Sequence, residues 1–238
     1  MTKQFSIKKI KNNIYIIEEK WFKEHANLYL FTGKKYNLLI DCGLGIFNIK
    51  EFLNKKGFKN IKVLLTHSHF DHAFGIRHFL PEEIIISHKV YKNLKHKRMC
   101  GIKYLKRKDF TEEVLSEVNF SNILRMYKNS TIFAKPQLLT KINVAPFCFE
   151  AVDMHGHTND STAYYDKNKG ILITGDALYI GEIYFDFSNS NKKKFKKSLK
   201  NMAKLNFKFV LPGHNKIFGK TKALEIIGNW SKTIDKAI

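Results

Sequence analysis

Cysteine is scarce in this chain of 238 residues, and its few copies are spread far apart. Cys42, Cys100 and Cys148 are odd in number and form no CxxC pair. This pattern argues against a disulfide framework, so we expect a reducing, cytoplasmic location. No apolar run approaches the roughly 18 residues that a membrane-spanning helix needs. The basic N-terminus is also not followed by the apolar core of a signal peptide, so we expect no membrane span.

Arginine is also rare, with only 4 arginines among the 42 basic residues that give a formal net charge of +21. Proteins that select nucleic acid favour the bidentate arginine fork for phosphate and base contacts. The composition therefore argues against a nucleic-acid partner despite the charge. Eight cations fall within residues 92–108 and six within 192–200. Solvated helix faces would account for these clusters, and attraction of an anionic substrate such as a phosphorylated carrier is the alternative.

Apolar periodicity predicts an α/β fold. The predicted strands are residues 14–17, 27–31, 37–40, 61–65, 83–87, 147–154, 161–165, 170–174 and 207–211. The predicted helices are residues 46–56, 111–128, 191–205 and 220–236. Strands followed by strand–helix alternation, in the same order in both halves, predict two mixed sheets packed face to face with helices outside. A chain of this length forms one domain, residues 1–238, on this interpretation.

Three histidines and one aspartate lie within six positions directly after the predicted strand 61–65. These residues are His67, His69, Asp71 and His72. Loops at strand ends are where open α/β sheets form their sites. Neutral imidazole and carboxylate are ligands that zinc, iron and manganese favour. Chance clustering among ten histidines is the alternative, but four such ligands at one strand end indicate a metal site.

Three later strand ends supply further residues of the same types. His157, Asp176 and His214 each follow a predicted strand and lie next to a glycine, which permits a sharp turn. Asp41 ends another strand ahead of Gly43. Each pattern alone is common in ordinary turns. Their joint occurrence in this order is much more specific.

These motifs together resemble the metallo-β-lactamase superfamily, from about residue 10 to residue 220. The resemblance implies a four-layer αβ/βα sandwich with a dinuclear metal site at one edge of the sheets. It implies that His67, His69 and His157 bind the first metal, that Asp71, His72 and His214 bind the second, and that Asp176 bridges them. Asp41 would orient these ligands. The cofactors would be two divalent ions, for which we expect Zn²⁺, and iron or manganese would suit the same ligands.

Four segments are similar to the animal metallo-β-lactamase-domain acyl-coenzyme A thioesterases: residues 27–30, 39–45, 171–179 and 211–219. The Asp176-x-x-Tyr179 spacing is similar in bacterial acyl-homoserine lactonases and does not separate the two branches. One departure is His155, where the family usually has proline before Gly156. This departure makes the local turn less rigid. True β-lactamases of this fold generally lack the bridging aspartate, so Asp176 argues against that activity.

We therefore predict a metal-dependent hydrolase in which a metal-bridging hydroxide attacks a thioester or related ester. The substrate would be a small molecule, with an anionic carrier such as coenzyme A. Asp71 would act as ligand and proton acceptor, and the Tyr179 hydroxyl would donate to the substrate carbonyl or oxyanion. A lactonase of the acyl-homoserine-lactone type is the alternative, followed by a phosphodiesterase or nuclease of the same fold. A binding module without activity is disfavoured, because no ligand is missing.

Overall fold

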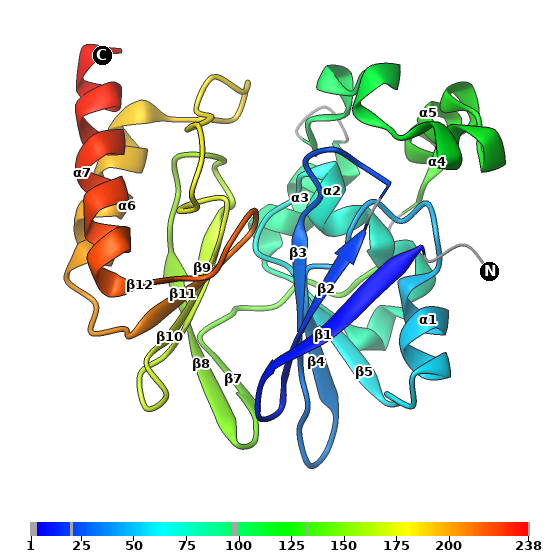
Figure 1. The fold of residues 1–238 in the computed structure, drawn as a ribbon, viewed down its shortest axis with the longest axis horizontal. Helices are drawn as coiled ribbons and strands as arrows, with labels where there is room; N and C mark the ends of the chain where they lie inside the picture. The colour runs from blue at the N-terminus through cyan, green and yellow to red at the C-terminus, as the bar shows by residue number, and fades with distance from the viewer. Residues whose placement is uncertain (1–3, 20, 97–99, 132, 238) are drawn as a thin grey trace. The chain divides into compact units, whose positions relative to one another are not determined.

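The computed structural model describes residues 4–19, 21–96, 100–131 and 133–237. The chain divides into two compact units, Met1–Gln137 and Leu138–Ile238. In Figure 1 the first unit runs from blue to green and the second from green to red. The expectation of one domain over residues 1–238 stays a prediction.

A six-stranded sheet forms the centre of the first unit, and its strand order follows the chain from β1 to β6. The strands are β1 (Phe5–Lys11), β2 (Ile14–Glu19), β3 (Asn27–Phe31), β4 (Asn37–Ile40), β5 (Ile61–Leu64) and β6 (Ile84–Ile85). Strands β1 to β4 pair antiparallel, while β4, β5 and β6 run parallel. Because β4 and β5 are parallel neighbours, the residues that follow them lie at the same edge of the sheet.

Short helices complete the first unit: α1 (Ile49–Lys55), α2 (Phe70–Ala73), α3 (His88–Lys95), α4 (Glu112–Glu117) and α5 (Phe120–Asn129). The 3₁₀ turns in the described part of this unit are η1 (Phe74–His78), η2 (Pro81–Glu83), η4 (Ile102–Tyr104) and η5 (Arg107–Asp109). The prediction of one helix over residues 111–128 is wrong. Val118 has an extended backbone, with φ −136° and ψ 109°. The side chain of Asn119 then caps a new helix by accepting a hydrogen bond from the Asn122 N–H.

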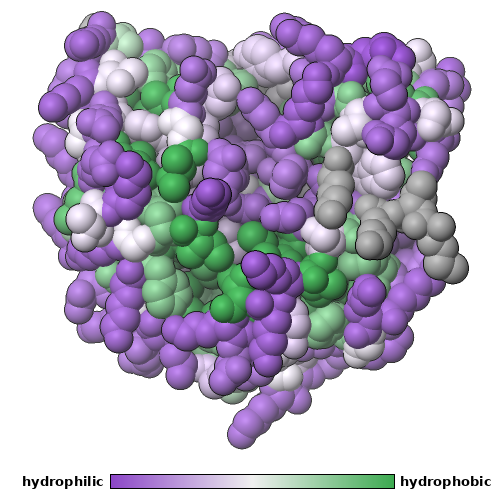
Figure 2. All heavy atoms as spheres, viewed as in Figure 1, coloured by the Kyte–Doolittle hydropathy of each residue, from purple (hydrophilic) through white to green (hydrophobic). Residues whose placement is uncertain are grey.

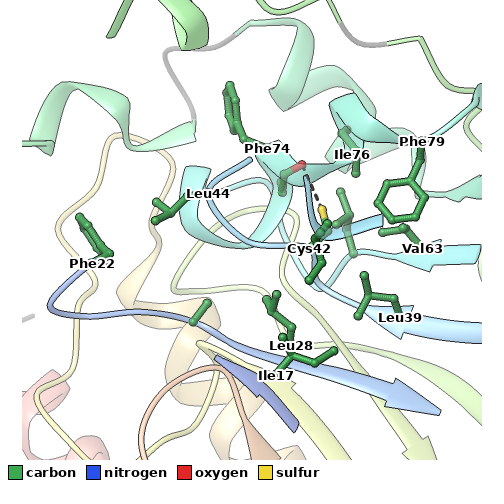
Figure 3. Packing of buried hydrophobic residues seen from close by; sticks show 14 of the residues in the cluster. Ile17, Phe22, Leu28, Leu39, Cys42, Leu44, Val63, Phe74, Ile76 and Phe79 are labelled. Carbon is green, nitrogen blue, oxygen red and sulfur yellow. Dashed lines mark hydrogen bonds between the residues drawn. The ribbon is translucent and has the colours of Figure 1, made fainter. Parts of the chain in front are cut away.

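The core of the first unit packs residues of the sheet against these helices, as the close-up in Figure 3 shows. Cys42 lies within it, fully buried, just beyond the end of β4. Its thiol donates weakly to the carbonyl oxygens of His72 and Ala73, both at 3.4 Å. Burial raises the pKa of this thiol well above its usual value, and the Asp41 carboxylate adds to the effect.

The second unit contains another six-stranded sheet, in the order β12-β11-β10-β9-β8-β7. Its strands are β7 (Lys141–Val144), β8 (Phe147–Asp153), β9 (Thr162–Asp166), β10 (Ile171–Gly175), β11 (Phe209–Pro212) and β12 (Phe218–Gly219). Only β10 and β11 pair in parallel among the described strands of this sheet. Helices α6 (Lys192–Ala203) and α7 (Lys220–Lys236) pack together on one face, with the Phe195 and Trp230 rings 6.0 Å apart.

Much of the face shown in Figure 2 is hydrophilic, as the high lysine content leads one to expect. In the 192–200 cluster, Lys192 pairs with Asp186 at 3.2 Å and Lys196 pairs with Asp235. These ion pairs are typical of a solvated helix face. In the 92–108 cluster, Lys97 and Arg98 lie outside the described residues. No helix in the described ranges is both long enough and apolar enough to cross a membrane.

Candidate metal centre

Asp41 organises the ligand loop of the first unit. Its Oδ1 accepts a hydrogen bond from the Thr66 backbone N–H at 2.8 Å, and its Oδ2 accepts one from the Thr66 hydroxyl at 2.8 Å. The same Oδ2 lies 2.8 Å from Nδ1 of His72. Asp41 is buried and has a left-handed backbone, with φ 58°, a conformation that aspartate tolerates better than most residues. These contacts agree with the orienting role expected of Asp41 toward His72, and that role stays a prediction.

These contacts determine which nitrogen of each histidine carries the proton. A carboxylate only accepts hydrogen bonds, so Nδ1 of His72 is the donor to Asp41. The Thr66 hydroxyl uses its hydrogen to donate a hydrogen bond to Asp41, so its oxygen accepts one from Nδ1 of His67 at 3.0 Å. In both rings Nε2 then carries the lone pair that a metal ligand requires.

The rings of the first unit are grouped at the start of α2. The ring centroid of His67 lies 4.7 Å from that of His69 and 4.3 Å from that of His72. Asp71 follows in the first turn of α2, and its Oδ2 lies 3.6 Å from Nε2 of His72. All four side chains are buried. The cluster that the sequence predicts is therefore assembled within one unit.

In the second unit, Asp176 lies between two histidines. Its Oδ2 is 3.4 Å from Nε2 of His157, and its Oδ1 is 3.3 Å from Nε2 of His214. The three residues follow different strands, namely β8, β10 and β11. Nδ1 of His157 lies 2.8 Å from the Tyr184 carbonyl oxygen, which can only accept, so this ring also has its lone pair on Nε2.

The spacing of these atoms fits metal coordination better than direct hydrogen bonding. The three nitrogen–oxygen separations of 3.3, 3.4 and 3.6 Å exceed the range of about 2.7–3.2 Å for good hydrogen bonds. Two ligand atoms held about 2.0–2.2 Å from one tetrahedral ion lie about 3.3–3.6 Å apart. Each pair of atoms thus suits a shared ion. The two oxygens of Asp176 face different histidines, as those of a bridging carboxylate do.

Close packing fixes the turn that carries His157. A Cβ on Gly156 would lie 2.2 Å from the Phe195 Cα of α6, and the glycine has φ 150°. The Ser190 hydroxyl donates to the His157 carbonyl oxygen at 2.5 Å. His155, which replaces the usual proline, has Nε2 3.4 Å from Asp153. Contacts with α6 and the preceding loop therefore hold this turn.

Tyr179, the predicted hydroxyl donor, is buried beside His214. The two ring centroids are 5.5 Å apart, and Trp230 packs on Tyr179 at 5.1 Å. The Tyr179 hydroxyl donates to the Glu182 carbonyl oxygen at 2.5 Å. Its position close to a candidate ligand agrees with the expectation, while its catalytic role stays a prediction.

Two residues of this region were not predicted from the sequence. Thr66 links Asp41 to His67, and its place directly before the histidine motif was the available signal. Glu19, at the end of β2, is buried and accepts a hydrogen bond from the Leu44 N–H at 2.7 Å. Burial raises the pKa of Glu19 to about 8, against the lowering effect of this hydrogen bond. No sequence pattern marks Glu19, because its partner lies 25 positions away.

Comparison with known proteins identifies the class. The family model described as Metallo-beta-lactamase superfamily matches residues 22–214. The chain belongs to this superfamily, and it is a hydrolase of that class with candidate metal-binding residues in both units.

Among curated proteins, the chain is similar to two acyl-coenzyme A thioesterases named MBLAC2. The protein from Gallus gallus is 26% identical and that from Homo sapiens 22% identical, each over 95% of this chain and 86% of the relative. The probable metallo-hydrolase YqgX of Bacillus subtilis is 28% identical over 66% of this chain and 68% of the relative.

Solved structures of the superfamily share the fold. The metallo-beta-lactamase family protein TTHA1429 from Thermus thermophilus matches with a TM-score of 0.70 at 16% identity, over 96% of this chain and 81% of its own. The DIM-1 metallo-beta-lactamase matches with a TM-score of 0.68 at 14% identity, over 99% of both chains. This likeness confirms the predicted fold class, the αβ/βα sandwich.

Proposed function

We propose that the chain is a dinuclear metal-dependent hydrolase that cleaves the thioester, or a related ester, of an acyl-coenzyme-A-like substrate. The observation that carries this proposal is the position of Asp176, whose two carboxylate oxygens face the Nε2 atoms of two different histidines at 3.3 and 3.4 Å. A carboxylate placed in this way can join two ions. A pair of ions is suited to activating water against a carbonyl group.

The ligand assignment follows the two groups of residues. In the proposed site, His67, His69 and His157 would hold one ion, and Asp71, His72 and His214 would hold the other. Asp176 would serve both ions. The donor set of imidazoles and carboxylates suits Zn²⁺, and iron or manganese as well. When bound, the ions would lower the pKa of water toward neutrality and stabilise negative charge on the substrate oxygen.

The side chains of this chain would supply the remaining chemistry. Asp71 would accept the proton of the attacking water, in addition to its role as a ligand. The Tyr179 hydroxyl would turn from the Glu182 carbonyl toward the substrate oxygen as negative charge develops there. A thiol is comparatively acidic, so its thiolate can leave without first taking up a proton, and thioester cleavage requires no further general acid.

The thioester is favoured over other bonds by the relatives. Both MBLAC2 proteins carry the name acyl-coenzyme A thioesterase, and the similarity extends over 95% of this chain. An anionic carrier also suits a protein with a formal net charge of +21. The proposed substrate is therefore an acyl group joined to coenzyme A through sulfur.

The direct test measures thiol release from a panel of acyl-coenzyme A esters, with metal content determined on the same preparation. We expect hydrolysis that a chelator abolishes and added Zn²⁺, Mn²⁺ or Fe²⁺ restores. The variant Asp176→Asn should lose most of this activity together with bound metal. Asp186→Asn, an exposed change of the same type in the same unit, serves as the control. Activity on lactones with none on any thioester would overturn the proposal in favour of a lactonase.

A further inference from the structure

Two of the four arginines of the chain line a single cavity in the first unit. Arg77 comes from η1 and Arg125 from α5. The cavity is open to solvent, with Arg77 and Arg125 both exposed. Its volume of about 320 Å³ is at the lower end of the range of about 300–1,000 Å³ typical of small-molecule sites. Its other lining residues are Asn122, Met126, Asn129 and Ser130. Residues that carry a second guanidinium, two amides and a hydroxyl therefore line the open cavity beside Arg77.

Buried aromatic packing holds the two arginine-bearing elements together. Phe74, three residues before Arg77, meets Tyr127, two residues after Arg125, with ring centroids 4.7 Å apart and an edge-to-face angle of 77°. Both rings are buried in the core of the unit. The backbones that carry the guanidinium groups are thus fixed relative to each other.

The charges in this cavity are not balanced by acidic side chains. Across the described ranges, neither Arg77 nor Arg125 forms an ion pair with a carboxylate. Arg107 shows the ordinary surface arrangement, since its two terminal nitrogens lie 3.2 and 3.1 Å from the oxygens of Glu112. Two uncompensated guanidinium groups at one cavity create an attraction for an anion.

The donor types indicate which anion would fit. The guanidinium fork matches the oxygens of a phosphate group bidentately. The side-chain amides of Asn122 and Asn129 add neutral donors to the same cavity. Arg77 also lines an adjoining cavity of about 150 Å³, whose other walls include Phe79, Pro81 and Ile84. A nucleotide requires hydrogen-bond donors for its phosphate groups and an apolar wall for its base, and the two cavities offer both.

We propose that this cavity binds the phosphate groups of the nucleotide part of the acyl carrier. This inference rests on the proposed function, because the cavity would be the binding site for the carrier of the proposed substrate. Arg77 lies five positions after His72 along α2 and η1, which is a path on the order of 10 Å at about 2 Å per residue. A pantetheine arm has the length of about four extended residues, roughly 15 Å. An arm of that length spans the path from the ligand loop to the cavity.

Binding of the nucleotide part alone tests the cavity without turnover. The probe is an adenosine bisphosphate that lacks the pantetheine arm, titrated by calorimetry into the full chain. Loss of charge-assisted hydrogen bonds in the double variant Arg77→Gln/Arg125→Gln should weaken binding by about 10- to 100-fold. The control Lys8→Gln/Lys9→Gln removes the same charge from exposed positions of β1 in the same unit and should bind like wild type. Equal affinity in wild type and the arginine variant would overturn the proposal.

Kinetics then separate this inference from the proposed function. The arginine variant should have a KM for acyl-coenzyme A raised about tenfold or more, with unchanged kcat/KM for an acyl-N-acetylcysteamine, a thioester without a nucleotide. An unchanged KM for acyl-coenzyme A in an active enzyme would refute the carrier site alone. Binding of inorganic pyrophosphate that acyl-coenzyme A does not displace would also refute it, in favour of a free phosphate site. Absence of all thioesterase activity would instead refute the proposed function.

Discussion

Replacement of Asp41 by asparagine tests the link between hydrogen bonding and metal affinity. Asp41→Asn keeps the size of the side chain, and asparagine also tolerates the positive φ of 58° at this position. The backbone and the packing are therefore preserved. What changes is that a group with two accepting oxygens becomes one with a single acceptor and a donating NH₂.

The expected magnitude follows from the three contacts of the carboxylate. Oδ2 accepts from the Thr66 hydroxyl and from Nδ1 of His72, and Oδ1 accepts from the Thr66 N–H, all at 2.8 Å. In either orientation of the amide, its NH₂ group faces a donor. A buried donor left unsatisfied costs about 1–3 kcal/mol in the free energy of unfolding. If the His72 ring changes tautomer so that Nε2 carries the proton, Nε2 loses the lone pair that a metal ligand needs. Metal affinity should then fall about 10- to 100-fold.

Two measurements on the purified protein decide the matter. Competition with a chromophoric chelator gives the metal affinity, and urea unfolding of the metal-free protein gives the stability. Asp109→Asn, in which the carboxylate caps an exposed 3₁₀ turn of the same unit, is the control. If Asp41→Asn bound metal as tightly as wild type and unfolded at the same urea concentration, the assigned orienting role of Asp41 would be refuted.

Three further changes test other parts of the structure. Burial raises the pKa of Glu19 from 4.5 to about 8, so the contribution of Glu19 to stability is complete below pH 4.5 and is lost as the pH rises toward 8. The metal-free variant Glu19→Gln should therefore gain stability relative to wild type over that pH range, by up to about 5 kcal/mol in urea unfolding. A difference between the two proteins that does not change with pH would contradict this. Gly156→Ala should lower the free energy of unfolding by about 3 kcal/mol or more, because its Cβ would lie 2.2 Å from Phe195. In contrast, Gly228→Ala, with nothing within 4 Å in α7, should gain about 0.5–1 kcal/mol; equal effects would refute the steric argument. Tyr179→Phe should reduce kcat about 100-fold with little change in KM. An unchanged kcat would refute the catalytic role of the hydroxyl and limit it to its hydrogen bond with the Glu182 carbonyl oxygen.

The sequence predicted most elements that carry the candidate ligands. Strand β5 occurs where a short apolar run predicted a buried strand, and both Val63 and Leu64 are buried. Helix α7 occurs where apolar spacing predicted it, because one face of the helix is buried. Strands β1, β7 and β12 were not predicted. Lysines interrupt the apolar residues of β1. Strand β7 is short, with alternate exposed residues, and β12 has only two residues. The helix break at Val118 was missed because apolar spacing continues across it.

Long-range contacts account for what was missed around the candidate site. The histidine motif and the strand-end residues were readable because each follows a local pattern. Glu19 is different, because its burial depends on Gly43 and Leu44, and a Cβ on Gly43 would lie 2.2 Å from the Glu19 carboxylate. The pairing of Arg77 with Arg125 depends likewise on the packing of Phe74 against Tyr127. Neither relationship has a sequence signature.

The buried thiol of Cys42 can report how often the ligand loop opens. Only the thiolate reacts with alkylating reagents, and Cys42 has a raised pKa and weak hydrogen bonds to the carbonyl oxygens of His72 and Ala73. Modification therefore has to wait until this part of the first unit opens transiently. The rate of Cys42 alkylation then measures that opening. An ion that binds only the closed form will lower the alkylation rate in proportion to its occupancy of the site. Metal binding can therefore be followed without any substrate.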